Sequence, residues 1–173
     1  MSLRLWLVRH ATTDRVAAGR LNGWEDVPLN QRGEIEAAAV HLPERNWAGV
    51  WSSDLSRALQ TARIAGFDPT VDSRLRELDF GSLEGMAWDE LEETTQSSLV
   101  EFDGFVAPGG ESWAHLRGRL GSFVVELAPG DHLIFTHGGV IRLLLRITGS
   151  SEHIPPGHTV VIEMPIGSAL WHP

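Results

Sequence analysis

Two short polar motifs, Arg9-His10 and Thr136-His137-Gly138-Gly139, each follow an apolar segment of the chain. A neutral imidazole has a lone pair that can attack phosphorus when a fixed acceptor holds its other ring nitrogen as N–H. An arginine beside it offers a planar fork of donors that suits phosphate oxygens. Glycines that open a helix let backbone N–H groups approach an anion. Each motif alone is typical of a polar loop, but the two together indicate phosphoryl chemistry.

A third motif places an arginine where a helix begins. In Ser52-Ser53-Asp54-Leu55-Ser56-Arg57-Ala58 a strand end leads into a helix, and Arg57 falls in its first turn. A cation is usually more stable at the C-terminal end of a helix, so this position hints at a nearby anion. The alternative is a surface arginine paired with Asp54.

The elements that position these motifs are predicted from hydrophobic patterns and capping residues. Residues 9–28 read as a long loop of the kind that is often functional, and residues 75–110 have the least legible pattern. Strands are predicted at 3–8, 50–52, 70–71, 132–136, 160–164 and 169–171; helices run from the Asn30 cap to His41, over 55–65, from the Ser112 cap to about Leu127 and over 140–147, with a short one near 88–93.

The alternation of strands and helices predicts an α/β fold: a three-layer α/β/α sandwich with a mainly parallel central sheet, in one domain over residues 1–173. Ligands of such sheets bind beyond the carboxyl ends of the strands. Since His10 and His137 each follow a strand, we expect both imidazoles to reach one crevice. Trp24 and Trp88 are expected near its mouth.

Composition excludes several other classes of site. The 173 residues include no cysteine, which removes disulfides, thiolate nucleophiles and cysteine zinc sites. The eight histidines show no HExxH spacing, and neither a Walker A nor a GxGxxG motif is present, so we expect no metal and no cofactor. A formal net charge of −9 disfavours nucleic acid and anionic membranes as partners. No apolar run has the length of a membrane span, and we expect a cytoplasmic protein.

Six segments in order give the chain a family resemblance. It resembles the histidine phosphatase superfamily, whose members have the phosphoglycerate-mutase-like fold. No single segment is specific, but their joint order is. The segments are LVRH at 7–10, GWEDVPL at 23–29, SSDLSRALQTA at 52–62, LRELDFGSLEG at 75–85, PGGES at 108–112 and THGGVIR at 136–142.

The resemblance implies a role for each candidate residue. His10 would accept the phosphoryl group, and Arg9, Arg57 and His137 would surround it with positive charge. Glu77 matches the residue that protonates the leaving oxygen. Glu84 is the rival acid and would otherwise orient Arg57 or a loop. Asn22 and Gly23 match a loop that touches the bound phosphate. Two further candidates for binding phosphate or substrate come from the residues themselves, Thr13 through its hydroxyl and Gly138 through its backbone N–H.

Three positions depart from the family pattern. Ala11 stands where glycine is usual, which is harmless only if its φ is negative. Thr12 replaces a common glutamate. Val16 replaces an asparagine that donates to phosphate, and Arg20 or Thr13 is the available substitute.

Three functions are compatible with these residues. The first is a metal-independent phosphomonoesterase acting on a small molecule. Within it, the LRELDFG and PGGES segments look most like α-ribazole phosphatase, which removes the 5′-phosphate of α-ribazole phosphate in cobalamin biosynthesis; a broad-specificity sugar phosphatase shares these features. The second is a phosphoglycerate mutase. The third is a catalytically weak protein that binds phosphorylated partners. The oligomeric state stays open, with a homodimer as one alternative.

Overall fold

The computed structural model describes residues 2–165, and the strands of this part form one five-stranded sheet. The order is β3-β2-β4-β1-β5, with β1, β2, β3 and β4 parallel and β5 antiparallel to β1. The predicted strand at 169–171 lies outside the described residues. The strands are β1 (Leu3–Arg9), β2 (Gly49–Ser52), β3 (Thr70–Val71), β4 (Gly130–Thr136) and β5 (Thr159–Met164).

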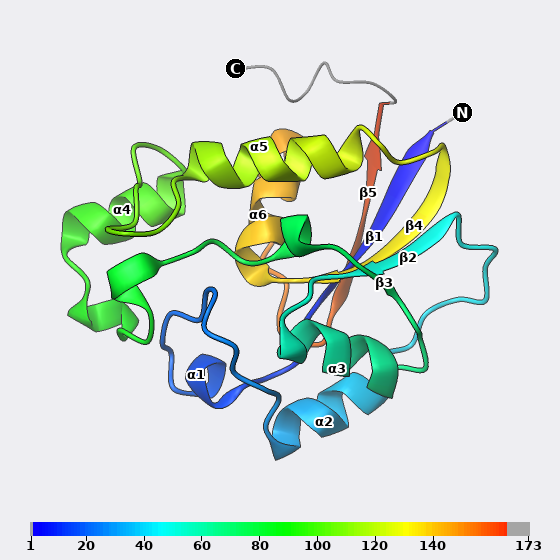
Figure 1. Cartoon of the computed structure of the whole chain (residues 1–173), viewed down its shortest axis with the longest axis horizontal. Helices are drawn as coiled ribbons and strands as arrows, with labels where there is room; N and C mark the ends of the chain where they lie inside the picture. Colours follow the sequence, from blue (N-terminus) through cyan, green and yellow to red (C-terminus); the bar gives the residue numbers. More distant parts are fainter. Residues whose placement is uncertain (1, 166–173) are drawn as a thin grey trace.

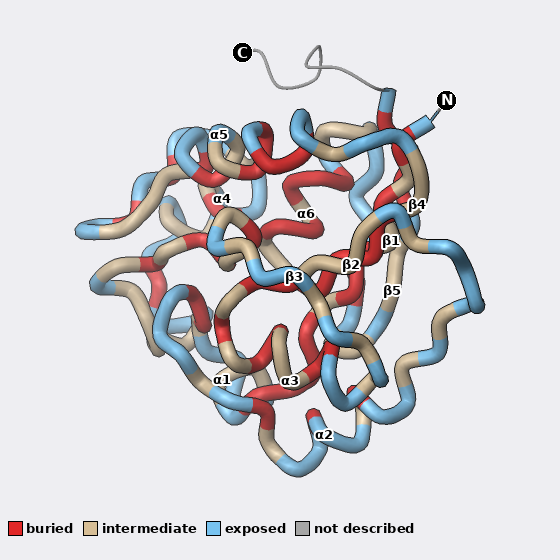
Figure 2. The backbone as a smooth tube through the Cα atoms, turned by 45° about the vertical axis from the view of Figure 1, so that its right-hand side comes forward, coloured by how far each residue is buried: buried red, intermediate tan, exposed pale blue. Residues whose placement is uncertain are grey.

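Helices cover both faces of this sheet, which confirms the three-layer α/β/α prediction (Figure 1). On one face α2 (Gln31–Ala38) packs on α3 (Ser56–Ile64), and Ala62 of α3 joins Val8 and Phe135 in an apolar cluster. On the other face Leu5 and Leu7 of β1 join the core with α5 (Trp113–Val124) and α6 (Gly138–Ile147). Successive residues of β1 thus alternate between the two layers, and buried backbone runs through the middle of the molecule (Figure 2).

The connections from β1 and β4 leave in opposite directions. The chain after β1 passes through α2 to β2, on the far side of β4, whereas the chain after β4 passes through α6 to β5, on the far side of β1. Two adjacent parallel strands whose connections diverge leave a crevice beyond their carboxyl ends. That crevice is where Arg9-His10 and His137-Gly138 leave the sheet.

Most predicted helices occur near their expected bounds, and their caps are as expected. Asn30 accepts a hydrogen bond from the Gly33 amide at 2.9 Å and caps α2, and Ser112 caps α5 through His115 N at 3.1 Å. The helix expected to reach His41 ends at Ala38, and the one expected to reach Leu127 ends at Val124. In both cases the residue that follows the helix, Ala39 or Val125, still has right-handed helical dihedral angles.

Two helices fall where none was expected at those bounds. The short α1 (Asp14–Ala17) lies within the predicted loop 9–28 and is capped by Thr13. The helix expected near 88–93 is a 3₁₀ turn at Trp88–Glu90, followed by α4 (Glu93–Glu101). Further 3₁₀ turns lie at Ser73–Leu75 and Gly81–Leu83. Within residues 2–165, no helix has the length and apolar character needed to cross a membrane.

Candidate active site

His10 is locked in place directly after β1. Its amide donates to the Thr136 carbonyl at 2.8 Å, which joins the end of β1 to the end of β4. Its ring Nδ1 lies 2.7 Å from the Ala11 carbonyl oxygen. Because a carbonyl oxygen only accepts, Nδ1 carries the proton and Nε2 keeps the lone pair. The side chain is therefore held in the tautomer that a nucleophilic Nε2 requires.

His137 lies beside it, at the point where α6 begins. The ring centroids of His10 and His137 are 5.1 Å apart, so the structure brings together two residues that lie 127 positions apart in the sequence. His137 is completely buried. Burial, together with the charge of Arg57, lowers the pKa of each imidazole well below its ordinary value. Both rings are therefore neutral at neutral pH.

Two arginines, the half-buried Arg9 and the fully buried Arg57, supply positive charge to the same place. Arg9 donates from Nη1 to the Ile154 carbonyl at 2.9 Å, and its Nε lies against Gly138. Arg57 has no exposed surface, and its guanidinium donates to the carbonyls of Asn22, Gly23 and Glu25 at 2.5–3.1 Å. The alternative partner of Arg57, Asp54, pairs with Arg76 instead. Burial lowers the pKa of Arg57 to about 10, so it stays charged at neutral pH.

Unpaired buried polar atoms gather around the two histidines. Nε of Arg9, Nε of Arg57 and both ring nitrogens of His137 lack a hydrogen-bond partner among the described residues. A buried donor without a partner is costly, and it is usually explained by a ligand, an ion or a catalytic role. Three basic side chains near His10 thus have nitrogens available to bind an oxyanion.

Glu77 reaches this site from the segment between two 3₁₀ turns. Its Oε2 accepts a hydrogen bond from the Gly139 amide at 2.9 Å, and its Oε1 accepts one from the Leu78 amide at 2.9 Å. The carboxyl group therefore sits at the first turn of α6, next to Gly138 and His137. A Cβ at Gly139 would collide with the carboxylate, so the close approach needs glycine there.

Glu84, the rival acid, is turned toward a loop. Its carboxylate accepts hydrogen bonds from the amides of Gly23 at 3.0 Å and Trp24 at 2.6 Å, and it pairs with Arg15 at 3.3 Å. The loop that it holds is the one whose carbonyls bind Arg57. Of the two carboxylates, only Glu77 lines the cavity that contains His10.

The remaining predicted binding residues lie on the loop after β1. Thr13 Oγ1 accepts hydrogen bonds from the Val16 amide and from Asn22 Nδ2 at 3.1 Å. Asn22 lines the cavity, and its Oδ1 has no partner among the described residues. A 180° flip of the Asn22 side-chain amide would let the Thr13 hydroxyl donate to Oδ1 of Asn22. The NH₂ group of Asn22 would then face the cavity. Gly23 does not line it.

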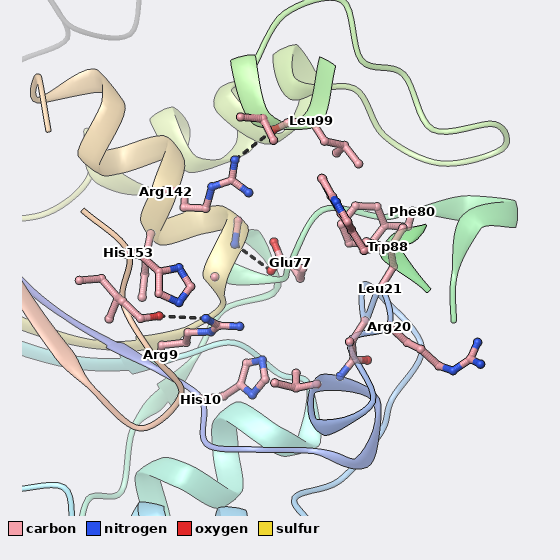
Figure 3. A pocket seen from close by; sticks show the side chains of 18 of the residues that line it. Arg9, His10, Arg20, Leu21, Glu77, Phe80, Trp88, Leu99, Arg142 and His153 are labelled. Atoms are coloured by element: carbon pink, nitrogen blue, oxygen red, sulfur yellow. Dashed lines mark hydrogen bonds between the residues drawn. The ribbon is translucent and has the colours of Figure 1, made fainter. Parts of the chain in front are cut away.

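The three residues that depart from the family pattern, Ala11, Thr12 and Val16, fit their surroundings in the structure. Phe102 is the one described non-glycine residue with positive φ, so Ala11 fits its position. Thr12 donates from its amide and hydroxyl to Glu36 at 2.9 and 2.7 Å. Val16 lines the cavity without a donor, and the guanidinium of Arg20 is turned away from His10 (Figure 3).

A cavity of about 510 Å³ extends from His10 (Figure 3). Trp88, expected near its mouth, lines it, whereas Trp24 does not; the Trp24 indole donates to the Glu77 carbonyl at 2.8 Å. Sequence reasoning missed Arg142 and His153 as lining residues. Arg142 lies five positions after His137 in the THGGVIR segment, a signal that was available; it donates to the Leu99 carbonyl at 3.1 Å. No group of three or more metal-ligating side chains occurs in the described part.

The buried histidines predict a loss of stability in acid. The lowered pKa values mean that the unfolded chain binds more protons than the folded one below about pH 6.5. Stability should therefore fall as pH drops from 6.5, by up to about 1.4 kcal/mol per pH unit for each histidine. Urea unfolding at several values between pH 7.5 and 5 would measure this slope.

A His137→Asn variant is the control. The other histidines contribute equally to the pH dependence of stability in the variant and in the unchanged protein, so a difference between the two reports on His137. Its stability should depend less steeply on pH than that of the unchanged protein. Equal slopes would contradict the assignment of the effect to this site.

Comparison with known proteins places this geometry in a family. A family model described as "Histidine phosphatase superfamily (branch 1)" matches residues 5–158. The chain is 40% identical over 158 residues to a probable phosphoglycerate mutase GpmB of Salmonella paratyphi C, covering 83% of this chain and 73% of the relative.

Solved structures with the same fold support this family membership. A phosphoglycerate mutase from Thermus thermophilus superimposes with a TM-score of 0.89 at 42% identity over 95% of each chain. A candidate α-ribazole-5′-P phosphatase from Escherichia coli superimposes with a TM-score of 0.80 at 24% identity over 95% of this chain and 92% of that one, which shows a shared fold.

Proposed function

The chain belongs to the histidine phosphatase superfamily, and from this premise we propose that it is a metal-independent phosphomonoesterase that works through a phosphohistidine at His10. The observation that carries the proposal is the set of unpaired nitrogens on Arg9, Arg57 and His137 around an imidazole whose Nε2 is free to attack. Phosphoryl transfer depends mostly on positioning and on stabilising charge on the equatorial oxygens. These side chains can supply both.

In the first step Nε2 of neutral His10 attacks phosphorus and the ester P–O bond breaks. The leaving oxygen takes a proton from the Glu77 carboxyl group, and such general acid catalysis is typically worth about 10²–10⁴ in rate. The phosphorylated ring keeps its Nδ1 proton, which donates to the Ala11 carbonyl.

In the second step water attacks the phosphorus of phosphohistidine. The Glu77 carboxylate accepts a proton from that water, the N–P bond breaks, and the electron pair returns to Nε2. Inorganic phosphate leaves, and both His10 and Glu77 recover their initial states. One carboxyl group thus acts first as acid and then as base.

The narrower proposal is that the substrate is α-ribazole 5′-phosphate. The LRELDFG and PGGES segments support it, and so does the wall of the cavity, where Trp88 and Phe80 offer flat apolar surface for a base. A phosphoglycerate mutase is the second candidate, because it is what the Salmonella and Thermus relatives are named.

The test is phosphate release, with EDTA present, from α-ribazole 5′-phosphate, 3-phosphoglycerate and p-nitrophenyl phosphate. Fast release from the first alone is the expected result. A mutase would instead interconvert phosphoglycerates and require 2,3-bisphosphoglycerate. If all three release rates equal those of a His10→Ala blank, the phosphatase proposal fails and a phospho-partner binding protein is left.

A further inference from the structure

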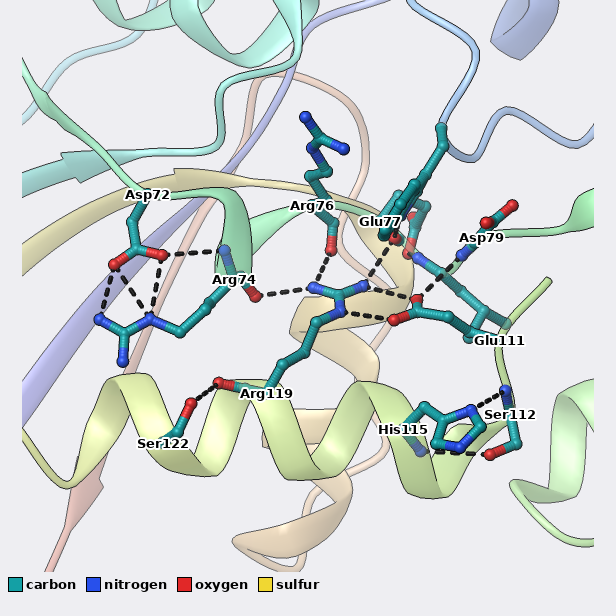
Figure 4. A network of polar contacts seen from close by, with 12 residues as sticks. Asp72, Arg74, Arg76, Glu77, Asp79, Glu111, Ser112, His115, Arg119 and Ser122 are labelled. Carbon is teal, nitrogen blue, oxygen red and sulfur yellow. Dashed lines mark hydrogen bonds and ion pairs between the residues drawn. The ribbon is translucent and has the colours of Figure 1, made fainter.

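The segment that carries Glu77 has no regular secondary structure to hold it. It lies between the 3₁₀ turns Ser73–Leu75 and Gly81–Leu83, and one side chain from α5 binds its backbone. Nη1 of Arg119 donates to the carbonyls of Arg74 and Arg76, each at 2.7 Å, and Nη2 donates to the carbonyl of Glu77 itself at 2.7 Å (Figure 4).

Arg119 is in turn fixed by Glu111. Nε of Arg119 donates to Oε1 of Glu111 and Nη2 donates to Oε2, both at 2.9 Å, and both side chains are largely buried. A guanidinium has five N–H donors, and these two bonds with the three carbonyl bonds use one each. Every N–H group of the Arg119 guanidinium is therefore hydrogen-bonded, and any other orientation of the guanidinium would leave some of these donors without a partner.

Glu111 also binds the far side of the Glu77 segment. Its Oε2 accepts from the Asp79 amide at 3.1 Å, and its own amide donates to the Asp79 carbonyl at 2.9 Å. A Cβ at Gly110 would collide with that carbonyl, so the backbones can approach only because glycine precedes Glu111. The PGGES and LRELDFG segments are thus joined by hydrogen bonds.

We propose that Arg119 and Glu111 are positioning residues that set the placement of the Glu77 carboxyl group for proton transfer. The proposal rests on the proposed function and extends it to two residues outside the cavity lining. Proton transfer is sensitive to placement, and an error of 1 Å can cost about 10² in rate. A lysine cannot replace Arg119, because it lacks the planar fork that spans three carbonyls and a carboxylate.

The test uses substrates whose leaving groups differ. An alkoxide needs a proton as it leaves, whereas p-nitrophenolate leaves without one. The rate to compare is that of the first step, phosphohistidine formation in a single turnover, because hydrolysis of the phosphohistidine is common to all substrates and also uses Glu77. We therefore expect Arg119→Lys to lower this rate for an alkyl phosphomonoester about 10- to 100-fold, with the rate for p-nitrophenyl phosphate changed less than threefold. KM should stay nearly constant, since the groups around the phosphoryl site are intact. Glu111→Gln, which keeps the shape of the side chain, should show the same selectivity if Arg119→Lys folds poorly.

Two reference variants complete the design. Glu77→Gln should show the same dependence on the leaving group, only larger; if it shows none, Glu77 is not the acid and the positioning proposal falls with it. Arg4→Met removes a partly exposed arginine paired with Glu163, remote from the cavity lining, and should leave both activities unchanged.

Equal loss on both substrates, or no loss on either, in both Arg119→Lys and Glu111→Gln would mean that the network serves stability alone. Failure of the proposed function itself looks different, because then the unchanged protein releases no phosphate above the His10→Ala blank from any substrate.

Discussion

Replacing His10 with alanine should remove at least about 10³-fold of the phosphatase activity, because no other described side chain in the cavity offers a neutral imidazole held in the nucleophilic tautomer. The remaining cationic groups would still bind phosphate. The variant should therefore fail in chemistry while it still binds inorganic phosphate.

The measurement is covalent labelling with a phosphomonoester carrying ³²P, quenched during turnover. The unchanged protein should carry label that survives base and is lost in acid, as expected for a phosphohistidine, and His10→Ala should carry none. His41→Ala, which alters an exposed histidine outside the cavity, is the matched control and should label normally. Label that persists in His10→Ala would move the nucleophile elsewhere.

Replacing Arg57 with methionine should lower kcat/KM by about 10²–10³, the typical cost of losing one hydrogen-bond donor to the transition state. The side chain has no exposed surface and donates to three loop carbonyls while its Nε stays unpaired. The variant therefore loses both a phosphate ligand and the support of the Asn22–Glu25 loop. Phosphate should no longer raise its thermal midpoint, since ligand stabilisation scales with affinity.

Arg63→Met serves as the control, because Arg63 is an exposed arginine on the same helix. It should keep both the activity and the phosphate-induced rise in midpoint. If Arg57→Met were to retain that rise, Arg57 would be a support for the loop and not a ligand of phosphate.

The sequence predicted the parts of the fold that have strong local signals. Apolar runs marked β1 and β4, and side-chain caps marked α2 and α5. The α4 helix was not predicted at its observed bounds. Leu99 is its one buried residue and its other positions are mostly polar, so its sequence shows no amphipathic period. Apolar runs and capping residues can be recognised within a short stretch of sequence. The position of a mostly polar helix such as α4 depends on tertiary packing, which a short stretch does not reveal.

The candidate site shows the same division. His10, His137 and Arg57 could be found because each stands at the end of a strand or the start of a helix. For Glu84 the sequence offered two roles, an acid or a residue that orients Arg57 or a loop, and it could not decide between them, since the two amide partners of Glu84 lie some 60 positions earlier. The partnership of Arg119 with three backbone carbonyls is equally invisible, because carbonyls carry no sequence signature.

The pairing of β1 with β4 also determines when the site can exist during folding. Leu3 pairs with Gly130 and Arg9 with Thr136, so the two strands that precede the histidines meet only after the roughly 120 residues between them have closed into one loop. Such distant pairing is entropically costly and slow to form. Partly folded chains therefore lack an anion site, and phosphate should slow global unfolding without protecting any earlier intermediate.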